Sequence, residues 1–268
     1  MYITNNVEVA KIAEKAGVDT IFVDMEYIGK DQRQGNLDTV QNHHTIEDVK
    51  NLRGALRKAN LLVRVNPIHE NSEAEVNAVI DAGADVVMLP WFHTAEEAEK
   101  FIKIVSGRAK TILLVENKKA IDNLDNILKV DGIDEVYIGL NDLSLSMGMK
   151  FMFQPMAEGI VESACEKIRS KNIPFGIGGI ARIGEGALPA EYIIQEHYRL
   201  GSTSAILSRT FCNIDNVSNY DSLENIFASG VFEIRKLERE CENASNEYFI
   251  ENKKILDAKI NNIVKGLD

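Results

Sequence analysis

Short apolar runs alternate with segments of helical periodicity along most of the chain, and this alternation constrains the fold more than any other feature. The apolar runs predict strands at 2–3, 20–23, 61–63, 86–89, 112–115, 136–138, 175–177 and 204–207. Between them, apolar residues recur at the three- and four-residue spacing of helices that bury one face. Strands that alternate with helices through short connections form a parallel sheet.

Eight such units favour a closed α/β structure, the TIM (β/α)8 barrel, over an open doubly wound sheet. The glycine-rich loop at 176–179 comes late in the chain and lacks the G-x-G-x-x-G spacing of a dinucleotide site. We therefore predict a barrel catalytic domain over residues 1–212. Residues 213–268 predict a helical C-terminal extension, whose narrow apolar stripe at Ile255, Ile260, Ile263 and Val264 suggests packing on a neighbouring subunit.

Composition excludes several classes of partner and site. The chain has 268 residues and a formal net charge of −11, which argues against nucleic acid and anionic membranes as partners. Its three cysteines are widely spaced without a C-x-x-C pair, so they indicate reduced thiols instead of disulfides or a zinc site. No secretory signal opens the sequence, and no apolar run nears the ~20 residues that span a bilayer. We expect a cytoplasmic protein.

Two neighbouring predicted strands are followed by carboxylates. Glu116 directly follows the run at 112–115, and Asp142 follows the run at 136–138 after three residues. The C-terminal ends of neighbouring parallel strands share one rim, so the two side chains should converge there. Two convergent carboxylates with room for water suit Mg²⁺ or Mn²⁺. The spacing leaves a second interpretation equally open, in which Asp142 is a helix N-cap and Glu116 lies in the first turn of the next helix.

Other strand ends carry further polar groups, and active sites of barrels are built from these ends. They are Asp24 and Glu26, Arg64, Pro90-Trp91, Gly178-Gly179 with Arg182, and Ser208-Arg209. Each has a structural explanation when taken alone, such as a surface arginine or a core tryptophan. Together they exceed what a purely structural barrel requires.

Several motifs occur in the order found in a known enzyme family. They are Asp24-Met25-Glu26-Tyr27, the segments at 63–67 and 83–90, Val115-Glu116, and the segment at 138–144. On these motifs, across roughly residues 1–212, the chain resembles the class II, metal-dependent pyruvate aldolases, typified by 4-hydroxy-2-oxoheptanedioate aldolase. That group belongs with the citrate lyase β-subunit and malyl-CoA lyases in the phosphoenolpyruvate/pyruvate barrel superfamily.

The resemblance implies roles for individual residues. Glu116 and Asp142 would be the ligands of a divalent metal, Mg²⁺ or Mn²⁺, with Co²⁺ as a further option. Arg64 would contact the keto oxygen of pyruvate and stabilise its enolate. Glu26 would lie near water on the metal, and Asp24 would be the partner of a catalytic histidine. The resemblance also implies a homo-oligomer, a hexamer in the family.

The chain departs from the family where protons are transferred. The histidine of the D-x-E-H motif is Tyr27 here, and Leu114, Leu140 and Asn141 also replace family residues. The base could instead be His43 or His44 in the following loop, since histidine has a suitable pKa. Tyr27 with a strongly lowered pKa and a hydroxide on the metal are the other candidates. A solvated loop explains the two histidines equally well.

These residues predict reversible retro-aldol cleavage of a 4-hydroxy-2-oxo acid to pyruvate and an aldehyde, through a metal-stabilised pyruvate enolate. No strand end carries a lysine, which argues against a Schiff base. The predicted substrate contacts are Arg64 and Trp91, with Gly178, Gly179 and Arg182 binding a carboxylate through backbone N–H groups and charge. The alternatives are a CoA-ester lyase of the citryl or malyl type and, because Tyr27 replaces histidine, a non-catalytic barrel that binds pyruvate or phosphoenolpyruvate.

Overall fold

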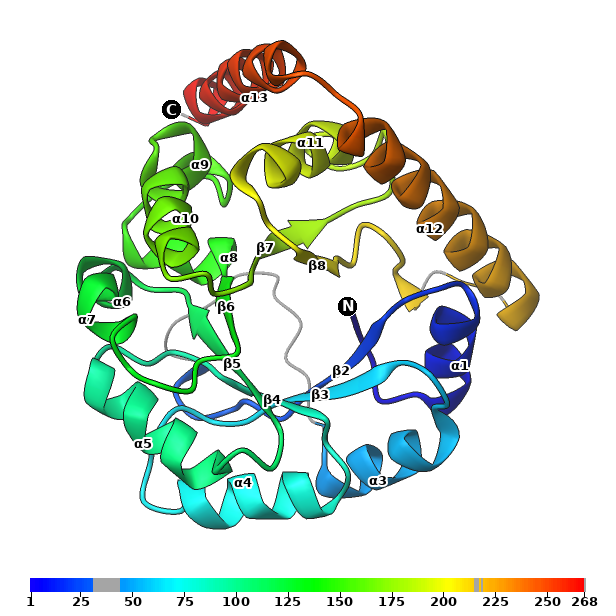
Figure 1. Ribbon diagram of the computed structural model, residues 1–268. Coiled ribbons are helices and arrows are strands. Elements are labelled where there is room, and N and C mark those ends of the chain that lie inside the picture. Colours follow the sequence, from blue (N-terminus) through cyan, green and yellow to red (C-terminus); the bar gives the residue numbers. More distant parts are fainter. Residues whose placement is uncertain (31–43, 215–216, 218, 268) are drawn as a thin grey trace.

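The protein forms a closed barrel of eight parallel strands surrounded by helices (Figure 1). The computed structural model describes residues 1–30, 44–214, 217 and 219–267. The strands follow one another around the barrel in sequence order, and β1 pairs with β8 to close it. The predicted (β/α)8 barrel is therefore confirmed. His43, one of the candidate bases, falls outside the described residues.

The strands are short and end at one common rim. They are β1 Tyr2–Ile3, β2 Thr20–Asp24, β3 Asn60–Arg64, β4 Val86–Leu89, β5 Lys110–Val115, β6 Glu135–Ile138, β7 Phe175–Ile180 and β8 Ser204–Leu207. The helices are α1 Val7–Lys15, α3 Ile46–Ala55, α4 Ser72–Asp81, α5 Ala95–Val105, α6 Lys118–Asp122, α7 Leu124–Ile127, α8 Leu140–Ser146, α9 Gln154–Ala157, α10 Ile160–Ser170, α11 Ala190–Leu200, α12 Tyr220–Glu242 and α13 Asn246–Gly266.

Two helices begin at capping residues that can be recognised in the sequence, whereas one predicted helix is interrupted in the structure. Thr45 and Thr94 each form a capping box, a pattern in which a Thr precedes an acid by three residues: the Thr hydroxyl accepts the N–H of that acid, and the acid accepts the Thr N–H. The sequence pattern predicts one helix over 155–170, but the structure has two helices there, α9 and α10. Gly159, with φ of 76°, lies between them, and this left-handed backbone cannot continue an α-helix.

Two layers of apolar side chains separate the inside of the barrel from its helices. Phe22, Leu62, Met88, Ile112 and Leu114 point inward from β2, β3, β4 and β5 and pack into one buried cluster. Residues of the opposite parity on the same strands pack outward against the helices, since side chains alternate along a strand. The barrel interior is therefore filled, and space for a ligand remains only at its ends.

Tyr137 on β6 links three strands across the filled interior. Its hydroxyl donates to the carbonyl of Gly178 on β7 and accepts the N–H of Ile206 on β8 at 2.9 Å. Burial raises the pKa of Tyr137 far above its ordinary value, so the phenol stays neutral. The ring lies against Gly176, where a Cβ would overlap both the ring and the hydroxyl of Ser204.

Gly176→Ala is expected to lower the free energy of unfolding by about 2–3 kcal/mol, because overpacking forces side chains and backbone to shift. Urea unfolding followed by circular dichroism measures the change. Gly54→Ala in α3 is the matched control, since no atom lies within 4 Å of its added methyl group. That change should be neutral or stabilising by up to about 1 kcal/mol. Equal stabilities for the two variants would contradict this account of Gly176.

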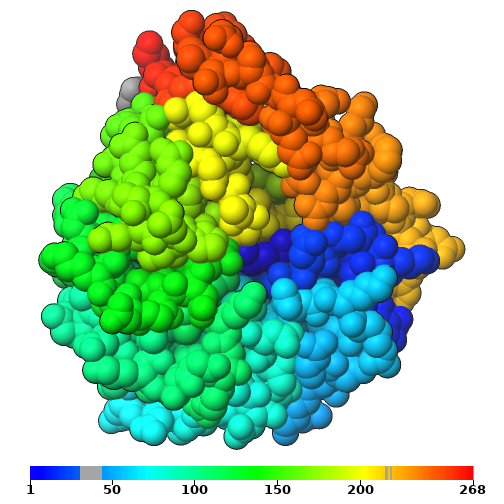
Figure 2. Space-filling view, in the orientation of Figure 1, coloured from blue at the N-terminus to red at the C-terminus, as the bar shows by residue number. Residues whose placement is uncertain are grey.

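The C-terminal helices wrap around the same barrel. Helix α12 packs on α1 and α11, and α13 packs on α9 and α11 (Figures 1 and 2). Within α13, Leu256 and Ile260 are buried, whereas Ile255 of the predicted stripe is exposed. Packing of this segment on a neighbouring subunit stays a prediction. Among the described residues, no helix has both the length and the apolarity needed to cross a bilayer.

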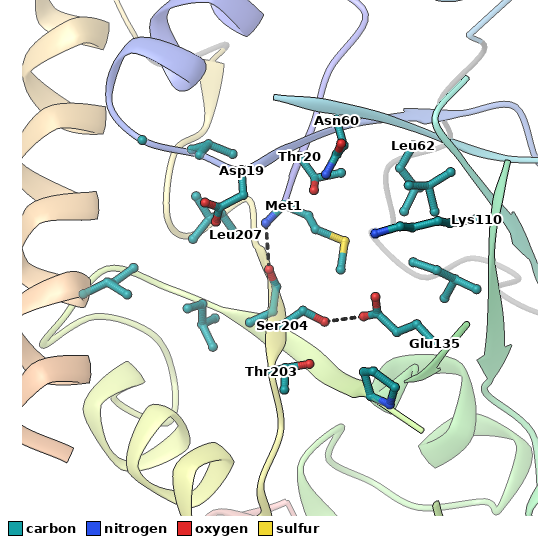
Figure 3. A pocket seen from close by; sticks show the side chains of 18 of the residues that line it. Met1, Asp19, Thr20, Asn60, Leu62, Lys110, Glu135, Thr203, Ser204 and Leu207 are labelled. Atoms are coloured by element: carbon teal, nitrogen blue, oxygen red, sulfur yellow. Dashed lines mark hydrogen bonds between the residues drawn. The ribbon is translucent and has the colours of Figure 1, made fainter. Parts of the chain in front are cut away.

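The N-terminal ends of the strands enclose a cavity of about 530 Å³ (Figure 3). Its polar lining includes Thr20, Asn60, Lys110, Glu135 and Ser204. The Ser204 hydroxyl donates to Glu135 at 2.6 Å, and burial raises the pKa of that carboxyl. In barrels of this kind the N-terminal face serves stability, whereas the chemistry occurs at the opposite rim.

Candidate functional site

A pocket of about 190 Å³ opens at the C-terminal ends of the strands and contains the acidic pair predicted from the sequence. Its polar and glycine lining consists of Arg64, Glu116, Tyr137, Gly139, Asn141, Asp142, Gly178, Gly179 and Ser208. Apolar side chains from inside the barrel form its floor, among them Phe22, Met88 and Leu114. The pocket is thus a small polar cavity with an apolar floor.

Glu116 is held at the end of β5 by backbone contacts. The Gly139 N–H donates to the Val115 carbonyl at 3.0 Å, which joins the ends of β5 and β6. A Cβ at position 139 would lie 2.9 Å from Cβ of Glu116, so glycine there makes room for the acid. Glu116 is buried and accepts the Trp91 N–H at 3.0 Å.

Trp91 supports the pocket through its backbone. Its φ of 46° is a left-handed conformation that a bulky residue seldom adopts, and such strain concentrates at functional sites. In this conformation its N–H bonds Glu116, while the indole ring meets His93 edge-on at 5.8 Å between centroids. The sequence predicted a substrate contact for the side chain, but gave no sign of this backbone contact.

Asp142 reaches the same pocket from the first turn of α8. The N-cap of that helix is Gly139, so the interpretation of Asp142 as an N-cap is wrong. Asp142 is buried and accepts the Asn141 side-chain N–H at 3.0 Å. The helix interpretation of Glu116 is also wrong, because α6 begins after Asn117, whose side chain accepts the Ala120 N–H at 2.9 Å.

The donor set of this pocket fits a hard divalent cation. Glu116 and Asp142 supply two buried carboxylates to one cavity. In the part of the chain that the structure describes, no group of three or more His, Cys, Asp or Glu side chains is placed to hold a metal. Mg²⁺ is commonly held by one or two carboxylates, with water and substrate oxygens completing the shell. A site of this kind needs the substrate to be complete.

Arg64 at the end of β3 is fixed by Asp24 at the end of β2. The two residues are register partners in the sheet. Arg64 Nε and Nη2 donate to the two oxygens of Asp24 at 2.9 and 2.8 Å, a bidentate pair that fixes the plane of the guanidinium. Glu26 lies 3.4 Å from Arg64 Nε. These contacts hold the Arg64 guanidinium in a fixed position at the pocket.

Lys30 completes a buried cluster of two acids and two bases. Its Nζ donates to Asp24 at 2.7 Å and lies 3.9 Å from Glu26. The Lys30 side chain is only 5 % exposed. The sequence does not predict Lys30 as part of the site. It is a single lysine at the start of a polar loop, four residues beyond Glu26, and this is only a weak indication of a buried ion pair.

Charge pairing keeps Asp24 and Arg64 ionised. Burial opposes ionisation of Asp24, but the charges and hydrogen bonds of Arg64 and Lys30 outweigh burial and lower the pKa of Asp24 well below its usual range. Burial likewise opposes the charge of Arg64, but Asp24 and Glu26 raise its pKa above the ordinary value. At neutral pH the pocket therefore contains the positively charged Arg64 beside the carboxylates of Glu116 and Asp142, the predicted metal ligands.

Asn66 orients the chain after β2. Its side-chain oxygen accepts the N–H groups of Tyr27 and Ile28, both at 2.9 Å, and its Nδ2 donates to Glu75 at 2.7 Å. The Tyr27 side chain is 65 % exposed. His44 approaches from the other direction, where its Nδ1 accepts the Asp24 backbone N–H at 3.0 Å. A neutral ring that accepts through Nδ1 carries its proton on Nε2.

The predicted glycine loop and its arginine separate in the structure. Gly178 and Gly179 line the acidic pocket, and Gly178 has a φ of 39°. A Cβ there would lie 2.6 Å from Leu140, so the close approach also requires glycine. Arg182 lines a different pocket, together with Arg209. Residues that the sequence predicted to act together therefore line two different pockets.

Comparison with known proteins agrees with this geometry. The profile described as "HpcH/HpaI aldolase/citrate lyase" matches residues 2–177. The chain belongs to the HpcH/HpaI aldolase/citrate lyase family. The resemblance drawn from the strand-end motifs is thereby confirmed, and the match includes Asp24, Arg64, Glu116 and Asp142.

Curated relatives within the HpcH/HpaI family are distant. The 2-keto-3-deoxy-L-rhamnonate aldolase of Escherichia coli strain K12 is 27 % identical over 203 residues, covering 64 % of this chain and 70 % of that protein. The same enzyme of Shigella sonnei strain Ss046 is 26 % identical with the same coverage. These relatives act on a keto-deoxy acid, as their names state.

Solved structures of other proteins share the fold. An HpcH/HpaI aldolase from Desulfitobacterium hafniense DCB-2 has a TM-score of 0.59 at 18 % identity, covering 87 % of this chain and 91 % of that one. The citrate synthase SbnG has a TM-score of 0.58 at 17 % identity, covering 78 % and 84 %. At this identity the likeness supports the barrel architecture alone.

Proposed function

We propose that the chain is a divalent-metal-dependent aldolase that cleaves a 4-hydroxy-2-oxo acid to pyruvate and an aldehyde. One observation carries the proposal: Glu116, Asp142 and Arg64 line a single small pocket at the strand ends of an HpcH/HpaI barrel. Two anions and one cation in one cavity can receive a 2-oxo acid together with a cation. Membership in a family of aldolases and lyases supports the same reaction class.

Glu116 and Asp142 would hold the cation, and their donor set fits Mg²⁺ or Mn²⁺. When bound, a divalent cation supplies Lewis-acid stabilisation of the negative charge that develops on the keto oxygen. The Trp91 N–H fixes one oxygen of Glu116, and Asn141 fixes one oxygen of Asp142. Both carboxylates are thus oriented by hydrogen bonds that do not depend on the cation.

Arg64 would bind the keto oxygen and favour the enolate. Its Nε and Nη2 are both bonded to Asp24, and Nη1 is the nitrogen that neither bond uses. A preorganised cation directed at an oxygen that gains charge lowers the barrier without reorganisation. The apolar floor formed by Phe22, Met88 and Leu114 excludes water and strengthens this interaction.

A second candidate is a barrel that binds pyruvate without cleaving a carbon–carbon bond. The observation in its favour concerns the two candidate proton acceptors: Tyr27 is largely exposed, and His44 already uses Nδ1 to accept the Asp24 N–H. Retro-aldol cleavage requires an acceptor for the proton of the C4 hydroxyl within hydrogen-bond reach. Binding alone requires none.

Pyruvate in D₂O tests the proposal. With Mg²⁺ present, the aldolase should exchange the pyruvate methyl protons, seen as loss of their ¹H NMR signal, and EDTA should abolish the exchange. A coupled assay with lactate dehydrogenase should detect pyruvate released from 4-hydroxy-2-oxo acids. Saturable pyruvate binding without exchange or release would favour the binding protein, and the absence of all three would overturn both candidates.

A further inference from the structure

A second pocket, of about 530 Å³, lies beyond the ends of β7 and β8. Arg182 follows the end of β7 by two residues, and Arg209 follows the end of β8 by two residues. Both arginines line this pocket, together with Thr210, Phe211, Cys212, Asn213, Val217 and Ile226. Two guanidinium groups at one rim form a local cationic site on a chain whose net charge is −11.

This arginine pocket adjoins the acidic pocket. Gly179 and Ser208 belong to the acidic pocket, and Ser208 directly precedes Arg209. The Ser208 N–H donates to the Ile180 carbonyl at 2.8 Å, so the ends of β7 and β8 are in contact there. Consecutive residues thus line the two pockets, with Ser208 in the acidic pocket and Arg209 in the arginine pocket.

Arg182 offers a donor that no group in the described part of the chain satisfies. Its Nε is buried and has no hydrogen-bond partner among the described residues. Its Nη2 lies 2.8 Å from Glu185, but both side chains are about 40 % exposed and such a pair is weak. A Cβ at Gly230 of α12 would lie 3.4 Å from Cγ of Arg182, so the helix packs closely on the arginine stem. A buried unpaired N–H indicates a place for a ligand oxygen.

The chemistry of the arginine pocket selects for an anion with several oxygens. Guanidinium groups bind carboxylates and phosphates through parallel N–H bonds. Thr210 and Asn213 add a hydroxyl and an amide to the lining. The loops after strands 7 and 8 are also where barrel enzymes commonly bind phosphate. The 190 Å³ pocket suits a three-carbon acid and a cation, whereas the second pocket has room for the remainder of a longer substrate.

We propose that Arg182 and Arg209 bind an anionic group at the far end of the substrate, so that the aldehyde released carries a phosphate monoester or a carboxylate. This assignment rests on the proposed aldolase function. It separates Arg182 from Gly178 and Gly179, with which the sequence predicted it to bind a substrate carboxylate, and assigns it to the far end of the substrate. A phosphate monoester and a carboxylate both present a terminal oxyanion, and the aldehydes used in the experiment distinguish the two.

Aldol addition of pyruvate with Mg²⁺ to paired aldehydes tests the assignment on the full chain. Glyceraldehyde 3-phosphate is compared with glyceraldehyde, and succinic semialdehyde with butanal. One charged aldehyde should exceed its neutral partner at least about tenfold in kcat/KM, and which one does so identifies phosphate or carboxylate. Arg182→Gln and Arg209→Gln should each lower that charged-to-neutral ratio by about 10- to 100-fold. Arg57→Gln, an exposed arginine at the other end of the barrel, should leave the ratio unchanged.

A direct binding measurement separates this inference from the aldolase proposal. Inorganic phosphate and glutarate are titrated into the protein by calorimetry, and binding of one of them should weaken about tenfold or more in both arginine variants. Thermal unfolding verifies that the variants are folded. Pyruvate exchange without any charge preference or anion binding would overturn the inference and leave the aldolase standing. Anion binding lost in the variants, with no pyruvate exchange, would overturn the aldolase and leave the anion pocket.

Discussion

Glu116→Gln is expected to lower the rate of Mg²⁺-dependent exchange of pyruvate methyl protons by at least about 100-fold. The substitution keeps the size of the side chain and an oxygen that can still accept the Trp91 N–H. It removes one of two negative charges that line the pocket, and with it most of the affinity for a divalent cation. The exchange rate, measured over a series of Mg²⁺ concentrations, should show a raised requirement for metal.

The matched control is Glu99→Gln, since Glu99 is exposed and pairs with Lys103 at the surface of α5. Its exchange rate should equal that of the wild type. Asp142→Asn should repeat the loss seen at Glu116, because each carboxylate would serve the same cation. If Glu116→Gln exchanged pyruvate normally at low Mg²⁺, the pair would not be a metal site and the proposed mechanism would be wrong.

The strand ends were predictable because their signal is local. The apolar runs of β2, β3 and β5 are closed by Asp24, Arg64 and Glu116, and the parallel register brings these closing residues to one rim. Thus Asp24 and Arg64, 40 residues apart, are register partners whose positions follow from the strand boundaries alone. The same logic places Glu116 beside Gly139 at the ends of β5 and β6.

Contacts made from loops were not predictable, because no periodicity encodes them. Lys30 pairs with Asp24 only after the chain turns back over β2, and the turn depends on Asn66 accepting the N–H groups of Tyr27 and Ile28. Trp91 illustrates a second kind of failure. The sequence does not show that its backbone N–H bonds Glu116, which becomes possible through a positive φ, whereas the substrate contact of its side chain stays a prediction.

Asp24→Asn should be the most destabilising change in the buried charge cluster, lowering the free energy of unfolding by about 3–5 kcal/mol. Asp24 accepts from both Arg64 and Lys30, so its loss leaves two buried cations with Glu26 as the remaining acid of the cluster. The folded-state pKa of Asp24 lies far below its unfolded value. Its contribution is therefore complete above about pH 4 and is lost as the pH falls below that value.

Urea unfolding at pH 7 and at pH 3 measures both effects. Asp24→Asn should be much less stable than the wild type at pH 7, and the difference should narrow at pH 3, where the aspartate stabilises less. Asp19→Asn is the control, because Asp19 pairs with Arg235 at 2.6 Å but is 75 % exposed. Exposed pairs contribute about 0–1 kcal/mol, so that variant should stay near the wild type at both pH values. Similar losses for the two variants would mean that the buried cluster stabilises the fold no more than an exposed ion pair does. The claim that Asp24 holds Arg64 in a fixed position would then be wrong.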